Sequence, residues 1–312
     1  MFSTHRTLIV ERPDYSIVVP VFNSVETLAP LYLGIEEVMN AINKSFEVVF
    51  VEDSGSQESW KALLGLKTKN PNSIQIIKLT RNFGQNGATV CGIDESIGET
   101  IITIDDDLQT PPSEILKLIE CWDKTGADVV YGQYKKSDSK LRRVGSTLMK
   151  RIFNNSQGGT SLGSSFRLIT QPIVNRLKYH SQDHLFINQI INWYTVNYGF
   201  VAIQSNPRPE GSSGYSLWKL ILISFRLIFY YTNIPLKLTI YVCITAVLGC
   251  AYFAWHFWKI ITPIDTEIEV TTIVLFMGLF LILSSICVLA VYINRIYNSR
   301  VKKPIYAIKA KL

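Results

Sequence analysis

The sequence ETIITIDDDLQTPP, at residues 99–112, joins a short β-branched run to three consecutive aspartates. The run Thr100–Ile104 has no charged residue, which is typical of a strand that is covered on both faces of its sheet. The acids that follow would therefore lie just beyond the carboxyl end of a buried strand. In extended backbone, Asp105 and Asp107 point to one side and Asp106 to the other. Two carboxylates directed together repel each other unless a cation lies between them or one of them takes up a proton.

This acidic stretch predicts a metal site. Carboxylate oxygens are hard ligands that favour Mg²⁺ or Mn²⁺, and Mg²⁺ binds readily beside substrate phosphates. Asp105 and Asp107 are the predicted ligands. An Asp-x-Asp tripeptide is also common in solvated turns. A solvated turn is the less favoured interpretation here, because the three acids follow a predicted buried strand and precede Leu108-Gln109-Thr110-Pro111-Pro112.

Short apolar runs alternate with helix-length amphipathic stretches from residue 15 to residue 132. This alternation predicts an α/β fold with an open, mostly parallel sheet and right-handed crossovers. Ligands of such sheets bind beyond the carboxyl ends of the strands, where Glu52 and Asp53 also fall. The predicted strands are Tyr15–Val19, Phe46–Val51, Ile74–Leu79, Thr100–Ile104 and Asp128–Tyr131, and the predicted helices lie near 25–42, 58–68, 87–97 and 113–124.

Charge is unevenly distributed along the 312 residues. Charged residues make up 18% of the chain, below the roughly 25% of soluble globular proteins, and 47% is hydrophobic, which excludes a disordered protein. Residues 1–211 carry 21 Lys or Arg and 22 Asp or Glu, whereas residues 212–312 carry 10 and 3. The basic C-terminal third suits anionic phospholipid better than nucleic acid.

Two long apolar segments, at about 236–261 and 271–293, predict transmembrane helices. Each is long enough to cross a hydrocarbon core of about 30 Å at about 1.5 Å per helical residue. The connection between them is acidic and the outer flanks are basic, so the positive-inside rule places both flanks in the cytoplasm. Apolar helices buried in a soluble core are the alternative.

Four motifs follow the predicted strands in order. They are Pro20-Val21-Phe22-Asn23, Val51-Glu52-Asp53-Ser54-Gly55-Ser56, Arg81-Asn82-Phe83-Gly84-Gln85 and Asp105-Asp106-Asp107-Leu108-Gln109. This order resembles glycosyltransferase family 2, and within it the polyprenyl-phosphate glycosyltransferases such as dolichol-phosphate mannose synthase and bactoprenol glucosyltransferase. The resemblance covers roughly residues 14–240. It implies a GT-A, Rossmann-like catalytic domain, a nucleotide-diphosphate sugar donor and Mg²⁺ or Mn²⁺.

The resemblance also implies roles for the pocket residues. Pro20, Phe22 and Asp53 fall where the family binds the nucleoside base. Phe22 replaces the usual tyrosine, which keeps the stacking face and loses the hydroxyl. Asp105 and Asp107 match the carboxylates that hold the metal and the donor diphosphate.

Gln109 accompanies these two carboxylates in the family and is predicted, with them, to be catalytic. Arg208 matches a basic residue used on the donor phosphates, for which the planar guanidinium is well suited. Gln133 stands where an arginine is common, and Lys135 or Lys136 can take that role.

Ser165 departs from the family pattern, because many relatives carry at its place a carboxylate that is often assigned as base. A hydroxyl acceptor needs such a base, whereas a phosphomonoester, with a second pKa near 6, is mostly dianionic already. We therefore interpret Ser165 as the mark of a phosphate acceptor.

The predicted organisation has three parts: a GT-A catalytic domain at 1–211, an amphipathic juxtamembrane helix at 212–235, and a two-helix anchor with a basic cytoplasmic tail at 236–312. Residues 300–312 could pair as a short strand. The predicted location is a bacterial inner membrane, which the chain crosses more than once, with the catalytic domain and both termini in the cytoplasm.

The predicted function is inverting transfer of a sugar from a nucleotide-diphosphate donor to a polyprenyl phosphate such as undecaprenyl phosphate. A UDP-sugar is expected first, with thymidine, cytidine and guanosine open, and the resemblance suggests a homo-oligomer formed through the C-terminal region. One alternative is a glycosyltransferase that extends a lipid-linked or protein-linked glycan at a sugar hydroxyl. Another is a catalytically silent membrane protein that binds nucleotide sugars.

Overall fold

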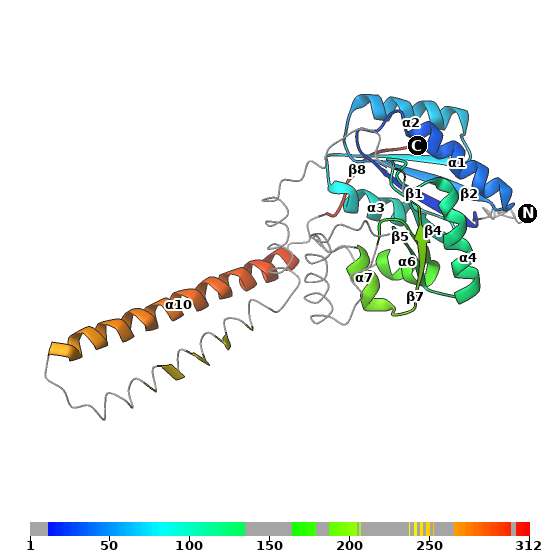
Figure 1. Cartoon of the computed structure of the whole chain (residues 1–312). Coiled ribbons are helices and arrows are strands. Elements are labelled where there is room, and N and C mark those ends of the chain that lie inside the picture. Colours follow the sequence, from blue (N-terminus) through cyan, green and yellow to red (C-terminus); the bar gives the residue numbers. More distant parts are fainter. Residues whose placement is uncertain are drawn as a thin grey trace, which may run out of the picture. The chain divides into compact units, whose positions relative to one another are not determined.

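The computed structural model describes residues 12–134, 164–178, 187–204, 206, several positions between 237 and 252, 265–300 and 304–312 (Figure 1). By its internal contacts the chain divides into two units. The first comprises Met1–Gly211 and Lys303–Leu312, and the second comprises Ser212–Lys302.

The first unit is built on one eight-stranded sheet with the order β7-β5-β6-β4-β1-β2-β3-β8. Its strands are β1 (Tyr15–Val21), β2 (Phe46–Glu52), β3 (Ile74–Leu79), β4 (Thr100–Thr103), β5 (Val129–Tyr134), β6 (Arg167–Thr170), β7 (Tyr198–Ile203) and β8 (Ile308–Lys311). Parallel pairs join β1 to β2 and β4, β2 to β3, and β5 to β7. Among the strands that the structure describes, β6 and β8 alone run antiparallel to the strands beside them. The α/β prediction with a mostly parallel sheet is confirmed.

Helices cover both faces of the sheet because successive strand residues point to opposite sides. Ile17 and Val19 of β1 pack with α1, α2 and α4, whereas Val18 packs with α3, α6 and α7 (Figure 1). All three valine and isoleucine side chains are fully buried. The helices are α1 (Leu28–Ala41), α2 (Gln57–Lys69), α3 (Gly84–Glu95), η1 (Pro112–Glu114), α4 (Ile115–Thr125), α6 (Gln171–Lys178) and α7 (Ile187–Tyr194).

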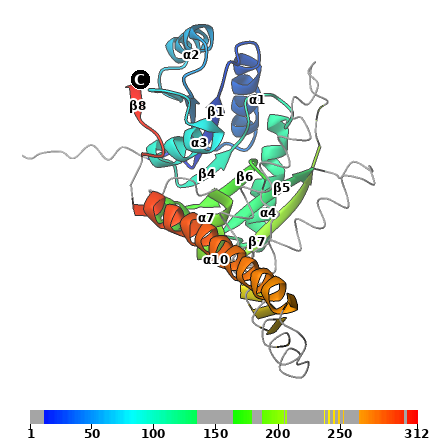
Figure 2. The same cartoon turned by 90° about the vertical axis from the view of Figure 1, so that its left-hand side faces the viewer.

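The five predicted strands and four predicted helices of the region 15–132 are all present, with ends shifted by a few residues. The C-terminal strand β8, labelled in Figure 2, is confirmed as well, since it pairs antiparallel with β3. Strands β6 and β7 were not predicted. The reason for β6 is its shortness and its buried Arg167, which hide the apolar run that normally reveals a strand.

The second unit contains α10 (Asp265–Arg300), whose described apolar side chains are largely exposed. Leu275 is 68% exposed and Ile282 is 59% exposed. Among the residues that the structure describes, no helix has both the length and the apolar character needed to cross a membrane. The two spans at 236–261 and 271–293 are therefore not confirmed, and the juxtamembrane segment 212–235 lies outside the described residues.

Candidate active site

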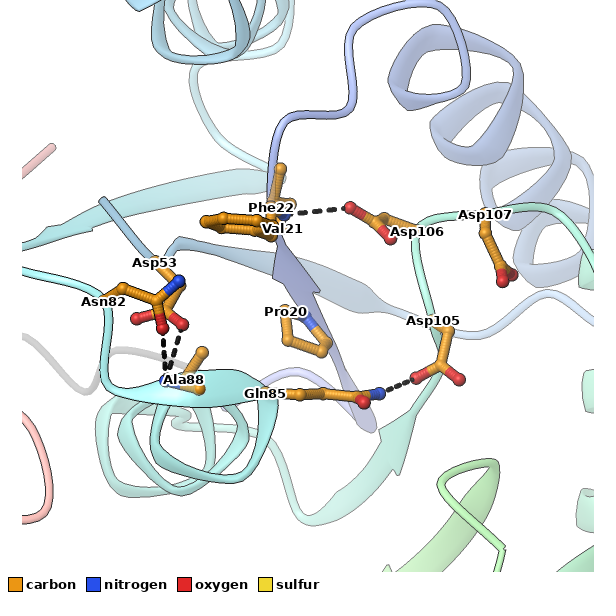
Figure 3. A pocket seen from close by; sticks show the side chains of 11 residues that line it. Pro20, Val21, Phe22, Asp53, Asn82, Gln85, Ala88, Asp105, Asp106 and Asp107 are labelled. Carbon is orange, nitrogen blue, oxygen red and sulfur yellow. Dashed lines mark hydrogen bonds between the residues drawn. The ribbon is translucent and has the colours of Figure 1, made fainter. Parts of the chain in front are cut away.

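A pocket of about 370 Å³ opens at the carboxyl edge of the sheet (Figure 3). Its lining comes from the ends of β1, β2 and β4 and from the beginning of α3. The lining residues are Pro20, Val21, Phe22, Asp53, Asn82, Gly84, Gln85, Ala88, Asp105, Asp106 and Asp107. The topology thus brings together residues that lie up to 87 positions apart, because parallel strands end at the same edge.

Pro20 helps to explain why the sheet opens at this point. The carbonyl of Val18 accepts from Ile104 N at 3.1 Å, so residues 18 and 20 of β1 face β4. Proline has no N–H to donate and cannot continue the ladder. Pairing between β1 and β4 ends at Val18 and Thr103, and the acidic loop departs from β1 beyond it.

Asp105 is held by one donor on each carboxylate oxygen. Gln85 Nε2 donates to Oδ1 at 2.6 Å and Ser165 Oγ donates to Oδ2 at 2.7 Å (Figure 3 shows the first bond). Burial raises the pKa of Asp105, and the neighbouring charge of Asp107 raises it further. The charged form is therefore costly in the protein alone, and a cation at this place would stabilise it.

The backbone turns directly after Asp105 instead of staying extended, and Leu108 adopts a left-handed conformation with φ 55°. Asp106 accepts a hydrogen bond from Phe22 N at 3.1 Å and so ties the acidic loop to the end of β1. Asp107 accepts from the backbone N of Gln109 at 3.0 Å and from its Nε2 at 2.6 Å. Gln109 thus orients Asp107, while Asp106 is occupied with the backbone of its neighbour strand.

Asp105 and Asp107 fit a divalent cation by their chemistry. Both carry carboxylate oxygens at the pocket, and the pKa of Asp105 is raised first by burial and then by the charge of Asp107, effects that a bound cation would oppose. No group of three or more His, Cys, Asp or Glu residues within the described ranges is arranged to hold a metal ion by itself. A cation here would therefore need further oxygen ligands from a substrate, as is usual for Mg²⁺ bound with phosphates.

Asp53 is 3% exposed and accepts two backbone hydrogen bonds at the beginning of α3. Phe83 N donates to its Oδ1 and Gly84 N to its Oδ2, both at 2.7 Å. Burial raises its pKa, and the two amides partly offset this effect. A carboxylate has about four acceptor positions, so Asp53 can order this loop and still accept one bond from a ligand in the pocket.

Phe22 and Glu52 lie at the ends of two neighbouring central strands but differ in exposure, since Phe22 follows β1 and Glu52 is the last residue of β2. The ring of Phe22 lines the pocket and is 51% exposed, which leaves a face open for stacking. Glu52 is fully buried, accepts from Gly55 N at 2.5 Å and lies 3.5 Å from Lys78 Nζ. Glu52 therefore supports the loop after β2 and does not line the pocket.

Two predicted site residues, Lys135 and Arg208, lie outside the described residues. Asn206, two positions before Arg208 in the sequence, donates from its backbone N to the carbonyl of Gln109 at 2.9 Å. Gln85 belongs to the motif Arg81-Asn82-Phe83-Gly84-Gln85, but no role was predicted for it. The contact of Ser165 with Asp105 was not predicted either, because the pairing of β6 with β4 has no local signal.

Comparison with known proteins identifies the family to which the chain belongs. Residues 16–176, about half of the chain, match the model of Glycosyl transferase family 2, and the chain belongs to this family of glycosyltransferases. The chain is 29% identical over 305 residues to the bactoprenol glucosyl transferase of Shigella phage SfX, a match that covers 95% of this chain and 99% of the relative. It is 28% identical over 302 residues to the undecaprenyl-phosphate 4-deoxy-4-formamido-L-arabinose transferase of Edwardsiella ictaluri, covering 94% and 93%.

Among solved structures, the mannosyltransferase PcManGT from Pyrobaculum calidifontis, in complex with GDP-Man and Mn²⁺, resembles the chain with a TM-score of 0.48. The two are 13% identical, and the match covers 93% of this chain and 88% of that one.

Proposed function

We propose that the protein is an inverting glycosyltransferase that moves a sugar from a nucleotide-diphosphate donor to a polyprenyl phosphate such as undecaprenyl phosphate. A UDP-sugar is the first donor to test. The observation that carries this proposal is the pocket at the sheet edge, where Asp105 and Asp107 lie beside Phe22 and Asp53. The names of the relatives support the acceptor, since they are transferases of bactoprenol and undecaprenyl phosphate.

The proposed donor site has two ends. Phe22 is proposed to offer a stacking face for the base, and Pro20 and Asp53 line the same pocket. Asp105 and Asp107 would hold Mg²⁺ or Mn²⁺, which when bound neutralises the leaving diphosphate. Gln85 and Ser165 keep Asp105 in place, and Gln109 keeps Asp107 in place. Arg208 and Lys135 are proposed to contact phosphate oxygens.

The environment of Ser165 supports a phosphate acceptor. Its hydroxyl donates to Asp105, so the position that often carries a base in relatives serves here to orient a carboxylate. A phosphomonoester with a second pKa near 6 needs no such base at neutral pH. The enzyme's task is then to position two anionic groups and to screen them from each other.

The proposed location is a bacterial inner membrane, with the catalytic domain and both termini in the cytoplasm. Residues 270–294 contain no charged side chain, and basic residues flank this segment and residues 236–261 on their outer sides. The pairing of β8 with β3 supports an even number of spans, because the C-terminus must then lie on the same side as the sheet. We propose further that lipid contact and assembly of a homo-oligomer involve the region 212–302.

A transfer assay tests this function. The full-length protein in detergent is incubated with radiolabelled nucleotide sugars, Mn²⁺ and undecaprenyl phosphate, and the Asp107→Asn variant serves as control. Label that enters the organic phase with the wild type, and not with the variant, is the expected result. Label found only in larger glycans would instead favour extension at a sugar hydroxyl. Saturable binding of the donor without any transfer would favour a silent binding protein.

A further inference from the structure

The C-terminal segment Pro304–Leu312 contacts the helix that carries part of the pocket. As β8 it lengthens the sheet beside β3, and Figure 2 shows it next to α3. Its backbone continues the pairing beyond the strand, since Thr80 N donates to the carbonyl of Ala307 at 2.9 Å. Thr80 directly precedes the loop that leads to Gln85. The segment therefore borders both the strand and the helix on either side of this loop.

Contacts between this segment and α3 occur near both ends of the helix. Near the first turn, a Cβ added to Gly87 would lie 2.9 Å from the carbonyl oxygen of Ile305 and 2.9 Å from Phe83 Cβ, closer than side chains normally approach. In the last turn, Tyr306 Oη donates to Asp94 Oδ2 at 2.9 Å and Lys311 pairs with Glu95. Positions 87, 94 and 95 lie on one face of a helix, because they are seven and eight residues apart.

The opposite side of α3 rests on the sheet. A Cβ on Gly92 would lie 2.3 Å from Val18 Cγ1 and 3.2 Å from Val51 Cγ2, so the helix approaches β1 and β2 as closely as a glycine allows. The partly buried ring of Tyr306 packs against the same apolar cluster that contains Val18 and Val51. The helix thus contacts the central strands β1 and β2 on one side and the C-terminal segment on another, and its position depends on both.

The position of α3 sets the geometry of the pocket. Its first residues supply the backbone N–H of Gly84 to Asp53 and the side-chain amide of Gln85 to Asp105. Gln85 and Ala88 line the pocket directly. A small displacement of the helix would lengthen the bond between Gln85 and Asp105, because hydrogen bonds weaken steeply with distance and angle.

We infer that the C-terminal segment positions the donor pocket, and that Tyr306, through α3 and Gln85, is a positioning residue for Asp105. The C-terminal segment Pro304–Leu312 would then contribute to a pocket whose lining residues all come from the first half of the chain. The inference rests on the proposed function for its kinetic test, whereas a measurement without ligand tests it independently.

The ligand-free test is hydrogen exchange of the Phe83 and Gly84 amides, which donate to Asp53. Tyr306→Phe removes only the hydroxyl. This variant is expected to speed exchange at these two amides about tenfold, because local opening becomes easier. Tyr32→Phe is the matched control: its hydroxyl donates to Glu36 at 3.0 Å on α1, away from the pocket.

The kinetic test compares KM and kcat for the donor. Tyr306→Phe is expected to raise the donor KM about fivefold, whereas Tyr32→Phe lowers Tm and leaves KM unchanged. In a Gln85→Ala background, Tyr306→Phe should raise KM no further, because both changes act through one bond. Exchange and KM of Tyr306→Phe equal to those of Tyr32→Phe would overturn the inference, and so would additive effects with Gln85→Ala. If the wild-type protein transfers no sugar, the proposed function is refuted. The hydrogen-exchange result then decides by itself whether the C-terminal segment positions the pocket.

Discussion

The two halves of the catalytic sheet differ in how they contribute to the pocket. One regular series of strand and helix contains β1 to β4, and its strand ends, loops and helix α3 supply the residues that line the pocket. Strands β5 to β7 include the antiparallel β6, which lies between β4 and β5 and brings Ser165 to Asp105. The pocket is therefore built from consecutive strand and helix units, whereas the position of Asp105 also depends on a pairing between strands that are distant in the sequence.

The largest effect is expected from the carboxylates of the first half. Asp105→Ala and Asp107→Ala should each lower kcat/KM at least about 10³-fold, on the order of 4 kcal/mol, because the cation that neutralises the diphosphate loses a ligand. Steady-state transfer to undecaprenyl phosphate measures this effect. Asp106→Asn is the matched control, since Asp106 accepts from Phe22 N, and it should lose much less activity. Equal losses in all three variants would mean that the loop as a whole, and not the pair of carboxylates, is required.

A smaller effect is expected from Gln85, the partner of Asp105 that belongs to the first half. Gln85→Leu keeps the volume of the side chain and removes a hydrogen bond to a charged group, which is typically worth about 1.5–3 kcal/mol. We expect kcat/KM to fall about 10- to 100-fold, with a higher Mn²⁺ concentration needed for half-maximal activity. Titration of activity with Mn²⁺ provides the measurement. An unchanged requirement for Mn²⁺ would show that Gln85 does not act on Asp105.

Ser165 tests the contribution of the second half. Ser165→Ala should lower kcat/KM about tenfold, the lower end of the range for a hydrogen bond to a charged group, since one such bond to Asp105 is lost. Ser165→Asp should fall below Ser165→Ala, because it adds a like charge beside Asp105. The three rates are compared at pH 7 with a polyprenyl phosphate acceptor. If Ser165→Asp exceeds the wild type by more than about tenfold, attack without a base is the wrong account of this site.

The smallest predicted effect concerns Asp94 on α3. Burial raises the pKa of Asp94, so the folded protein binds its proton more tightly than the unfolded chain does. The stability that this group contributes is complete below its ordinary pKa of 3.8 and is lost as the pH rises through the folded value. Asp94→Asn has no such loss, and its Tm relative to wild type should rise by about 2 °C between pH 3.5 and pH 7. A Tm difference that is constant over this range would contradict the assignment.

Much of the first half could be predicted from the sequence because its signals are local. The apolar runs at Tyr15–Val21 and Phe46–Glu52 identify central strands, and a parallel arrangement puts Phe22, Asp53 and Asp105 at one edge. The two backbone bonds of Asp53 could not be predicted, because they depend on the exact path of the loop after β3.

Strand β6 and the contacts of the C-terminal segment could not be predicted, because the sequence carries no local pattern for them. Arg167 is 5% exposed within the short strand β6, and a buried charge interrupts the apolar pattern by which strands are recognised. The contact of Tyr306 with Asp94 joins residues 212 positions apart, and no spacing rule reaches so far. Lys135 and Arg208 were predicted from a family pattern, and they stay predictions.

The most direct test of the central claim, that Asp105 and Asp107 bind a diphosphate through a divalent ion, is thermal unfolding with UDP or GDP, with and without Mn²⁺. Wild type should show a Tm that rises with nucleotide concentration only when Mn²⁺ is present, because a ligand that binds the folded state stabilises it by mass action. Chelation of the metal or the Asp107→Asn substitution should abolish this rise. An equal rise without metal, or in Asp107→Asn, would contradict the claim.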